Sequence, residues 1–199
     1  MPKIGFLITN AMPDAKIRKF RIGVAKYQTI MNPATPSLVF EKTFANFYLL
    51  RLSTAEKAFF FSEMRACAPK DPIVFADYLQ SHGISKFQFS FATKAVHTFD
   101  PTSPIYDSRV ADYLKKFEGC SGIRLHAVMR RDPVTKKSKF DPVADHLRVI
   151  NNWNIIKSWY ASFKADPRYK QWISWFDGEF GSNTITDTKK IDFIIWALS

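Results

Sequence analysis

Apolar residues recur at three- and four-residue spacing along most of the chain, and hardly any segment alternates apolar and polar residues as a strand would. This pattern predicts an all-α protein whose helices are joined by short connections. The expected helices lie at residues 35–52, 53–68, 71–83, 85–99, 107–117, 141–166, 166–181 and 184–198. We expect the last of them to be amphipathic.

Helix-start signals mark several of these boundaries. Three Asp-Pro pairs, at 71–72, 141–142 and 166–167, place an N-cap residue before a proline in the first turn. Ser53 is followed three residues later by Glu56, which is the pattern of a capping box. Each of these starts is expected to satisfy backbone N–H groups that the helix itself leaves free.

The helix that begins at Asp107 has a clear apolar side. Val110, Tyr113, Leu114 and Phe117 recur at helical spacing, so we expect all four to face the core.

We expect one helical domain over residues 1–199. Residues 1–37 have no clear pattern and are interpreted as an irregular N-terminal extension, in which residues 16–26 ("KIRKFRIGVAK") carry five cations and no acid. Residues 119–141 are expected to be a loop region, and "RRDPVTKKSK" (130–139) an exposed basic turn that could contact phosphates.

The charge balance suggests a polyanionic partner. Lys and Arg number 29 against 18 Asp and Glu, which gives a formal net charge of +11. Cations that neutralise phosphates release counterions and so strengthen binding to nucleic acid. DNA is therefore the leading partner, a membrane surface is the second, and a merely soluble basic protein is the alternative to both.

The sequence offers no support for a cofactor or a metal. Cys67 and Cys120 are isolated, and the four histidines form no zinc-binding pair. Two cysteines cannot hold an iron–sulfur cluster, and no glycine-rich nucleotide-binding motif occurs. The chain shows no signal peptide and no apolar run long enough for a membrane span. We expect a cytoplasmic monomer that does not associate with membranes.

One carboxylate falls at a position where it could carry chemistry. Residues 90–114 ("SFATKAVHTFDPTSPIYDSRVADYL") form a helix, a proline-containing turn and a second helix opened by Asp107. An Asp at an N-cap accepts hydrogen bonds from backbone N–H groups and interacts favourably with the positive end of the helix. That role alone would explain Asp107.

The same stretch resembles the signature of the helix-hairpin-helix base-excision DNA glycosylases. In that family a helix with Ala in its first turn leads through a short loop to Pro, an apolar pair and Asp, with Val three residues on. The matching residues here are Ala92, Pro104, Ile105, Tyr106, Asp107 and Val110. The family's hairpin usually carries Gly-x-Gly, whereas "HGISKFQFS" (82–90) has Gly83 alone.

The resemblance implies that Asp107 is the catalytic carboxylate, which stabilises a cationic sugar or activates the nucleophile while a base flipped out of duplex DNA departs. Members that also cleave the backbone carry a lysine at the position of Ser90. Lys94, one turn later on the same helix face, and Lys86, one turn earlier, are the amines that could form a Schiff base if burial lowered the pKa.

Two further expectations concern the surroundings of this site. Lys86, Gln88 and Arg109 are expected to bind DNA, and Ser90 and Lys94 to face a cleft that Asp107 borders. The alternative is that Ser90, Lys94 and His97 form a solvated polar stripe along the helix.

We therefore expect a DNA glycosylase that acts in base-excision repair or in defence against modified phage DNA, with or without an associated lyase activity. Damaged purines, mismatched bases and hypermodified phage bases all remain candidate substrates. A non-catalytic DNA-binding protein on the same fold is the first alternative. A helical protein-interaction domain is the second.

Overall fold

The computed structural model describes residues 14–84, 87–127, 129–131, 138–181 and 183–198. These residues are predominantly helical, which confirms the all-α class. The helices are α2 (Asp14–Met31), α3 (Ser37–Phe47), α4 (Thr54–Cys67), α5 (Pro72–Ser81), α6 (Phe89–Phe99), α7 (Ser108–Phe117), α8 (Pro142–Phe163), α9 (Pro167–Phe180) and α10 (Asp187–Leu198).

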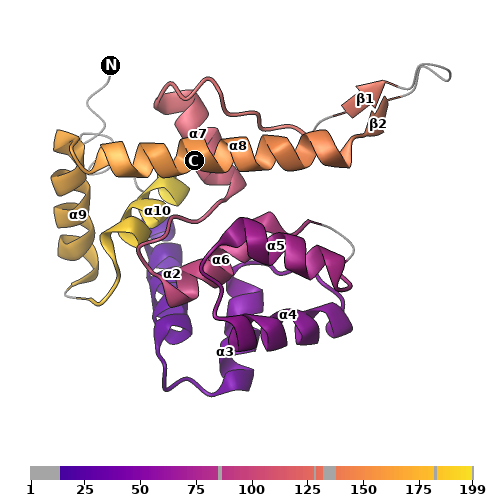
Figure 1. Cartoon of the computed structure of the whole chain (residues 1–199). Helices are drawn as coiled ribbons and strands as arrows, with labels where there is room; N and C mark the ends of the chain where they lie inside the picture. The colour runs from indigo at the N-terminus through magenta and orange to yellow at the C-terminus, as the bar shows by residue number, and fades with distance from the viewer. Residues whose placement is uncertain (1–13, 85–86, 128, 132–137, 182, 199) are drawn as a thin grey trace.

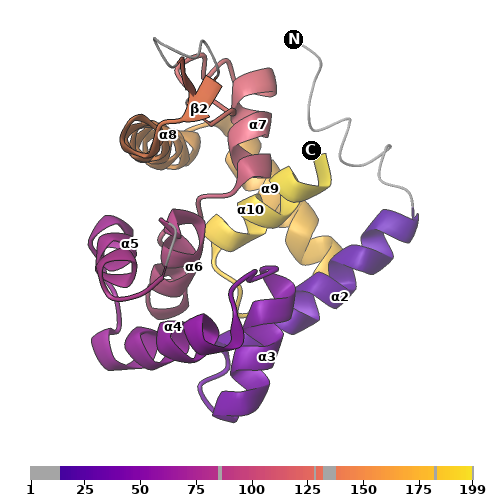
Figure 2. The same cartoon turned by 90° about the vertical axis from the view of Figure 1, so that its right-hand side faces the viewer.

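The helices form two groups with the C-terminal helix between them. Figure 1 shows α8 along one side of the molecule, with α9 descending from its C-terminal end, and α3 to α6 on the opposite side. In Figure 2, α10 lies centrally, between α7 and the N-terminal helices. Helix α10 contacts α7, α9 and α2, and α5 packs directly against α6. The two helices of the candidate site, α6 and α7, thus belong to different groups.

The sequence signals for helix starts are confirmed at each of the predicted caps. Ser53 and Glu56 form the complete capping box of α4. The side chains of Asp71, Asp141 and Asp166 accept backbone N–H bonds at the starts of α5, α8 and α9. These bonds fix the first turns without tertiary contacts, which is why the boundaries could be read from sequence.

The N-terminal segment differs from the expectation. Residues 14–31, inside the segment interpreted as irregular, form α2, while residues 1–13 lie outside the described part. Helix α2 buries Val24, Tyr27 and Ile30. These three apolar residues recur at helical spacing, but the many cations around them obscure the pattern.

Helix α10 lacks the amphipathic character that the sequence pattern predicted. Nine of its 12 residues are buried, including Lys189, Lys190 and Asp192. A helix enclosed by other helices on all sides has no solvated face, so its charged residues must find partners inside the protein.

Two smaller expectations are also corrected. Helix α6 begins at Phe89 rather than Ser85, because Gln88 takes the N-cap position; residues 85 and 86 lie outside the described part. Phe117 is 58% exposed on the last turn of α7 and contacts Tyr113 instead of entering the core.

The region predicted to be a loop contains a short hairpin. Strands β1 (Met129–Arg131) and β2 (Ser138–Phe140) pair antiparallel, with Met129 opposite Phe140. Strands this short carry too few residues to show an alternating pattern, which is why the sequence did not reveal them.

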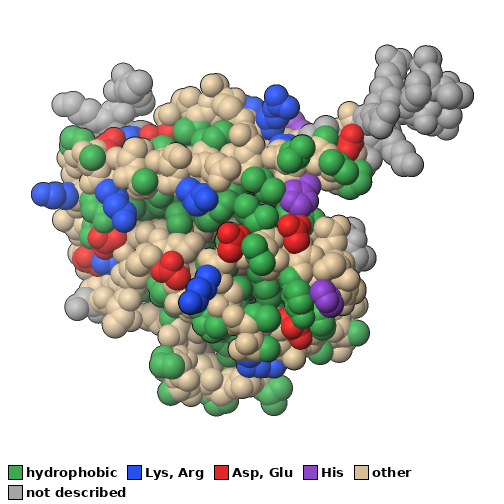
Figure 3. All heavy atoms as spheres, in the orientation of Figure 1, with side chains coloured by type: hydrophobic (Ala, Val, Ile, Leu, Met, Phe, Trp, Pro, Cys, Tyr) green, Lys and Arg blue, Asp and Glu red, His purple; other side chains and the backbone are tan. Residues whose placement is uncertain are grey.

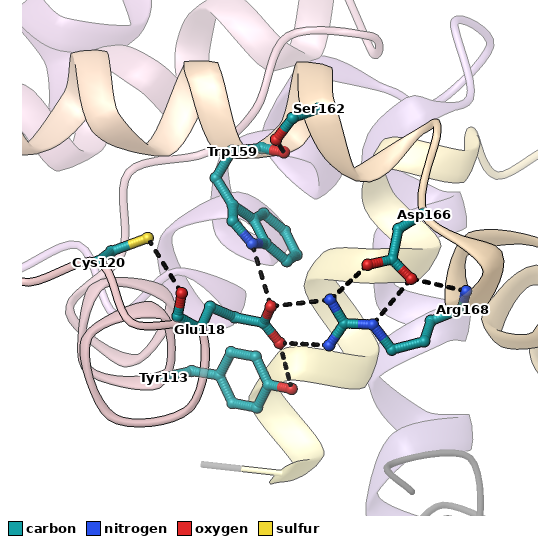
Figure 4. A network of polar contacts seen from close by, with 7 residues as sticks. All are labelled: Tyr113, Glu118, Cys120, Trp159, Ser162, Asp166 and Arg168. Atoms are coloured by element: carbon teal, nitrogen blue, oxygen red, sulfur yellow. Dashed lines mark hydrogen bonds and ion pairs between the residues drawn. The ribbon is translucent and has the colours of Figure 1, made fainter. Parts of the chain in front are cut away.

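A polar network fixes the end of α7 to α8 and α9 (Figure 4). Arg168 donates to both carboxylate oxygens of Glu118, at 2.8 and 2.9 Å, and also to Asp166 at 2.7 Å. Tyr113 and Trp159 donate to the same Glu118 carboxylate at 3.4 Å. The pKa of Arg168 is raised by its hydrogen bonds to the two carboxylates. This network holds the helix that begins at Asp107 in a defined orientation.

Candidate active site

Two hydrogen bonds fasten the segment before Asp107 along α6. The Ser90 hydroxyl donates to the Tyr106 carbonyl at 3.0 Å, and the Tyr106 N–H donates to the Thr93 hydroxyl at 3.1 Å. Thr93 in turn donates to the Ser90 carbonyl at 2.9 Å. The start of α7 is therefore held against the first turn of α6, next to Lys94.

Lys94 is a buried amine directed at this junction. Its Nζ donates to Ser90 Oγ at 3.0 Å and lies 3.8 Å from Asp107 Oδ2. The residue is only 4% exposed, and its ammonium lies 4.9 Å from the ring centroid of Phe91 and 5.2 Å from that of Tyr48. Such rings stabilise a cation but cannot replace water as acceptors of its hydrogen bonds.

Burial lowers the pKa of Lys94 to about 8, although the carboxylate of Asp107 opposes the shift. A lysine with such a pKa holds an appreciable share of free amine near neutral pH, whereas an ordinary lysine holds almost none. A free amine is the form that attacks carbon, so this site can supply a nucleophile. Among the described residues, Lys94 is the lysine that forms an ion pair with the Asp107 carboxylate.

The two carboxylate oxygens of Asp107 have different partners. Oδ1 accepts the Arg109 N–H at 2.8 Å and caps α7, and Oδ2 faces Lys94. The side chain keeps 17% of its surface exposed, so it lies between the buried amine and the outside. The cap expected from sequence is present, and it uses Oδ1 alone, so Oδ2 can interact with Lys94.

His97 and Lys94 do not belong to a solvated stripe. His97 is 1% exposed. Its ring forms hydrogen bonds with the Tyr27 hydroxyl at 2.7 Å and with the Ser103 carbonyl at 2.6 Å. Burial, assisted by the charge of Lys189, lowers the pKa of His97 to about 3, so the ring is neutral. The solvated-stripe interpretation is therefore wrong, because Tyr27 on α2 contacts His97 and Tyr48 after α3 lies against Lys94.

A second buried pair lies behind Lys94 and was missed by the sequence reasoning. Lys189 Nζ lies 2.6 Å from Asp192 Oδ2, and their side chains are 0% and 2% exposed. Burial raises the pKa of Asp192, and Lys189 opposes that shift. Five rings surround the Lys189 ammonium at 4.9 to 5.7 Å: Tyr27, Phe47, Tyr48, Phe193 and Trp196.

The sequence carried one weak signal for this pair. Lys189 and Asp192 are three residues apart in a segment that continues with the apolar run "FIIWAL". At that spacing they share a helix face, and a helix this apolar is often enclosed.

The residues expected to bind DNA are only partly described. Arg109 is exposed and lines a surface pocket of about 340 Å³ together with Tyr106, Ser108 and Asn152. Its guanidinium lies 6.0 Å from the Trp196 ring. Gln88 is half-buried just before α6, and Lys86 lies outside the described residues.

The surface charge forms no single basic track on the face shown in Figure 3, where Lys and Arg side chains are scattered among hydrophobic and uncharged ones. The side chains of the basic turn at 130–139 are outside the described part. Among the residues described, no group of three His, Cys, Asp or Glu is placed to hold a metal ion, and none of the helices is long and apolar enough to cross a membrane.

Comparison of the chain with known protein families, with curated proteins and with solved structures found no match.

Proposed function

We propose that this protein is a DNA N-glycosylase of the helix-hairpin-helix type, which removes a damaged or modified base by cleaving its N-glycosidic bond. The observation that carries the proposal is the pairing of a buried amine of lowered pKa, Lys94, with a carboxylate at a helix start, Asp107. The pairing combines the two groups that such chemistry uses, in the stretch that resembles the family's signature.

In the proposed reaction, Asp107 is the catalytic carboxylate. As the glycosidic bond breaks, the base leaves with the bonding electron pair and takes up a proton, and positive charge develops on the sugar. The Asp107 carboxylate stabilises that charge. Either water or the free amine of Lys94 then forms the new bond to C1′ of the sugar. Attack by the amine leads to an imine and so gives access to cleavage of the backbone, which water does not.

Other features fit this function without requiring it. Helices α5 and α6 pack against each other and are joined through Gly83, which has a positive φ of 118°. Arg109, exposed at the first turn of α7, could hold the phosphate backbone beside Asp107. Ser90 links Lys94 to the Tyr106 carbonyl and so orients the amine.

The direct test is release of a base. The protein is incubated with a panel of duplexes that contain damaged purines, mismatches or modified bases, and with phage DNAs that carry hypermodified bases. Mass spectrometry identifies any base released, and Asp107→Asn serves as the control. Release by the natural protein but not by the variant supports the proposal, and the panel identifies the substrate. If no member of the panel loses a base, the proposal is contradicted.

A non-catalytic DNA-binding protein on the same fold is the second candidate. It is favoured by the cap hydrogen bond of Asp107, which matches those of Asp71, Asp141 and Asp166 at other helix starts. This candidate predicts salt-sensitive DNA binding with no base release, so the same panel separates the two.

A further inference from the structure

Lys94 and Lys189 share one aromatic ring. The Tyr48 ring centroid lies 5.2 Å from Lys94 Nζ and 5.6 Å from Lys189 Nζ. Tyr48 follows α3 and is 5% exposed, and its hydroxyl has no hydrogen-bond partner in the part of the chain that is described. Two ammonium groups from α6 and α10 therefore meet at one buried ring, from which water is excluded.

The two lysines differ in the distance from each ammonium to its carboxylate partner. Lys189 forms a close ion pair with Asp192, and five rings surround its ammonium. Lys94 bonds to the neutral Ser90 hydroxyl and lies at the longer distance of 3.8 Å from Asp107. Like charges repel each other strongly in a poorly solvated interior, so the nearby Lys189 ammonium disfavours the charged form of Lys94.

We propose that Lys189 is a positioning residue for Lys94: its positive charge, which lies against the same Tyr48 ring, opposes protonation of the Lys94 amine and maintains a share of it as a free nucleophile. The role of that nucleophile rests on the proposed glycosylase function. Asp192 holds the Lys189 ammonium in the aromatic cage and limits how strongly its charge acts on Lys94.

The other groups around Lys94 agree with this assignment. Burial is the largest cause of the lowered pKa of Lys94; Asp107 opposes it, Lys189 lowers the pKa further, and Asp192 raises it. His97 on α6 is neutral, as its lowered pKa shows.

The tyrosines near the site are also uncharged. Burial is the largest cause of the raised pKa values of Tyr27 on α2, Tyr48 after α3 and Tyr160 on α8. The charges that act on Lys94 are thus those of Asp107, Lys189 and Asp192.

The test is a pH titration of the Lys94 side chain in the free, full-length protein, followed by the ¹³Cε resonance and assigned with Lys94→Arg. Lys189→Met removes the neighbouring cation, and we expect the midpoint to rise by roughly half a pH unit or more. Asp192→Asn removes the opposing anion, and we expect the midpoint to fall by a similar amount. Lys189→Arg keeps the charge and should leave the midpoint near its original value.

Opposite shifts in the two variants support the proposal. An unchanged midpoint in a folded Lys189→Met protein would overturn it. If Lys189→Met does not fold, the Asp192→Asn titration decides, with an unchanged midpoint again overturning it. Failure of both variants to fold, judged by near-UV circular dichroism, would assign the pair a structural role only and would equally overturn the proposal.

A second measurement links the titration to chemistry. Borohydride trapping of the protein on DNA with an abasic site at pH 7 should fall about three-fold in Lys189→Met, which is the loss of free amine that a half-unit shift produces. If the natural protein releases no base and traps no DNA but the titration shifts, the proposed function fails and the coupling of the two lysines stands. If it releases bases and traps DNA but the midpoint is unmoved, the function stands and this inference fails.

Discussion

Lys94 Nζ lies 3.8 Å from Asp107 Oδ2, and the lysine is almost completely buried while the carboxylate keeps contact with the outside. The two residues come from α6 and the start of α7, which a proline-containing turn connects. The arrangement puts a partly neutral amine behind a carboxylate that also caps a helix.

Replacing Asp107 with Asn separates its two roles. Asn can still accept the Arg109 N–H bond, so the free energy of unfolding should fall by no more than about 1 kcal/mol. The lost charge no longer stabilises a cationic sugar, so single-turnover base release should drop roughly a hundred-fold or more. DNA affinity should stay the same or rise slightly, because a charge that phosphates repel has gone.

Melting temperature, DNA affinity and base release are measured on the same Asp107→Asn protein. Base release at the natural rate would show that Asp107 is only a cap, and the glycosylase proposal would fail with it.

Replacing Lys94 with Met should remove the trapped covalent adduct with abasic DNA. Met has a similar length and no charge, so the buried site stays filled. Base release that relies on water should persist, because Asp107 is unchanged. Lys115→Met is the matched control, since Lys115 is an exposed lysine on α7, and it should leave trapping unaltered. Trapping at the natural level in Lys94→Met would exclude this lysine as the nucleophile.

Stability should rise with pH between about pH 8 and pH 10. The pKa of Lys94 is about 8 in the folded protein and 10.5 in the reference state. Between these values the unfolded chain binds more protons, so raising the pH favours folding, by something on the order of 2 to 3 kcal/mol in total. Above pH 10 the gain reverses, because Tyr27 and Tyr113 have raised pKa values and ionise first in the unfolded chain.

The measurement is urea unfolding at several pH values, compared with Lys94→Met. The variant should lack the rise between pH 8 and pH 10 and should be at least as stable as the natural protein at pH 7. An identical slope in both proteins would mean that Lys94 keeps an ordinary pKa.

Loss of the Glu118 carboxylate should destabilise the fold more than loss of an exposed ion pair. Glu118→Ala leaves Arg168 without the bidentate partner that it contacts at 2.8 and 2.9 Å, and the Glu118 side chain is only 7% exposed. We expect a cost of about 2 to 4 kcal/mol by denaturant unfolding. Lys116→Ala breaks the exposed pair with Asp112 on the same helix and should cost at most about 0.5 kcal/mol. Equal losses of unfolding free energy in the two variants would show that the Glu118–Arg168 network adds no more stability than an exposed ion pair.

Binding to duplex DNA should weaken steeply with salt. The net charge of +11 predicts a loss of affinity on the order of ten-fold or more between low and physiological ionic strength. Arg109→Ala should reduce the slope of affinity against salt, because one phosphate contact is lost, whereas Arg65→Ala on α4 should not. Fluorescence anisotropy measures both. Salt-independent binding, or no binding, would contradict both DNA hypotheses.

The helical class and most helix boundaries could be predicted from residues that are close together in the chain. Ser53 with Glu56, and the Asp-Pro pairs at 71–72, 141–142 and 166–167, satisfy backbone N–H groups within a few residues of themselves, so their effect needs no tertiary partner. Asp107 as the cap of α7 was readable for the same reason. The resemblance around Asp107 was visible because its residues are contiguous in the chain.

Which charged residues are buried depends on tertiary packing and could not be predicted from the sequence. Lys94 and His97 lie on one side of a helix, and the sequence is compatible with that side being either solvated or buried. Tyr27 on α2 and Tyr48 after α3 cover it. The sequence predicted an amphipathic C-terminal helix, on which Lys189 and Asp192 would be solvated. Contacts of α10 with α7, α9 and α2 bury both residues instead. Burial depends on contacts between segments far apart in sequence, and burial is what lowers the pKa of Lys94 and gives its amine a possible role in chemistry.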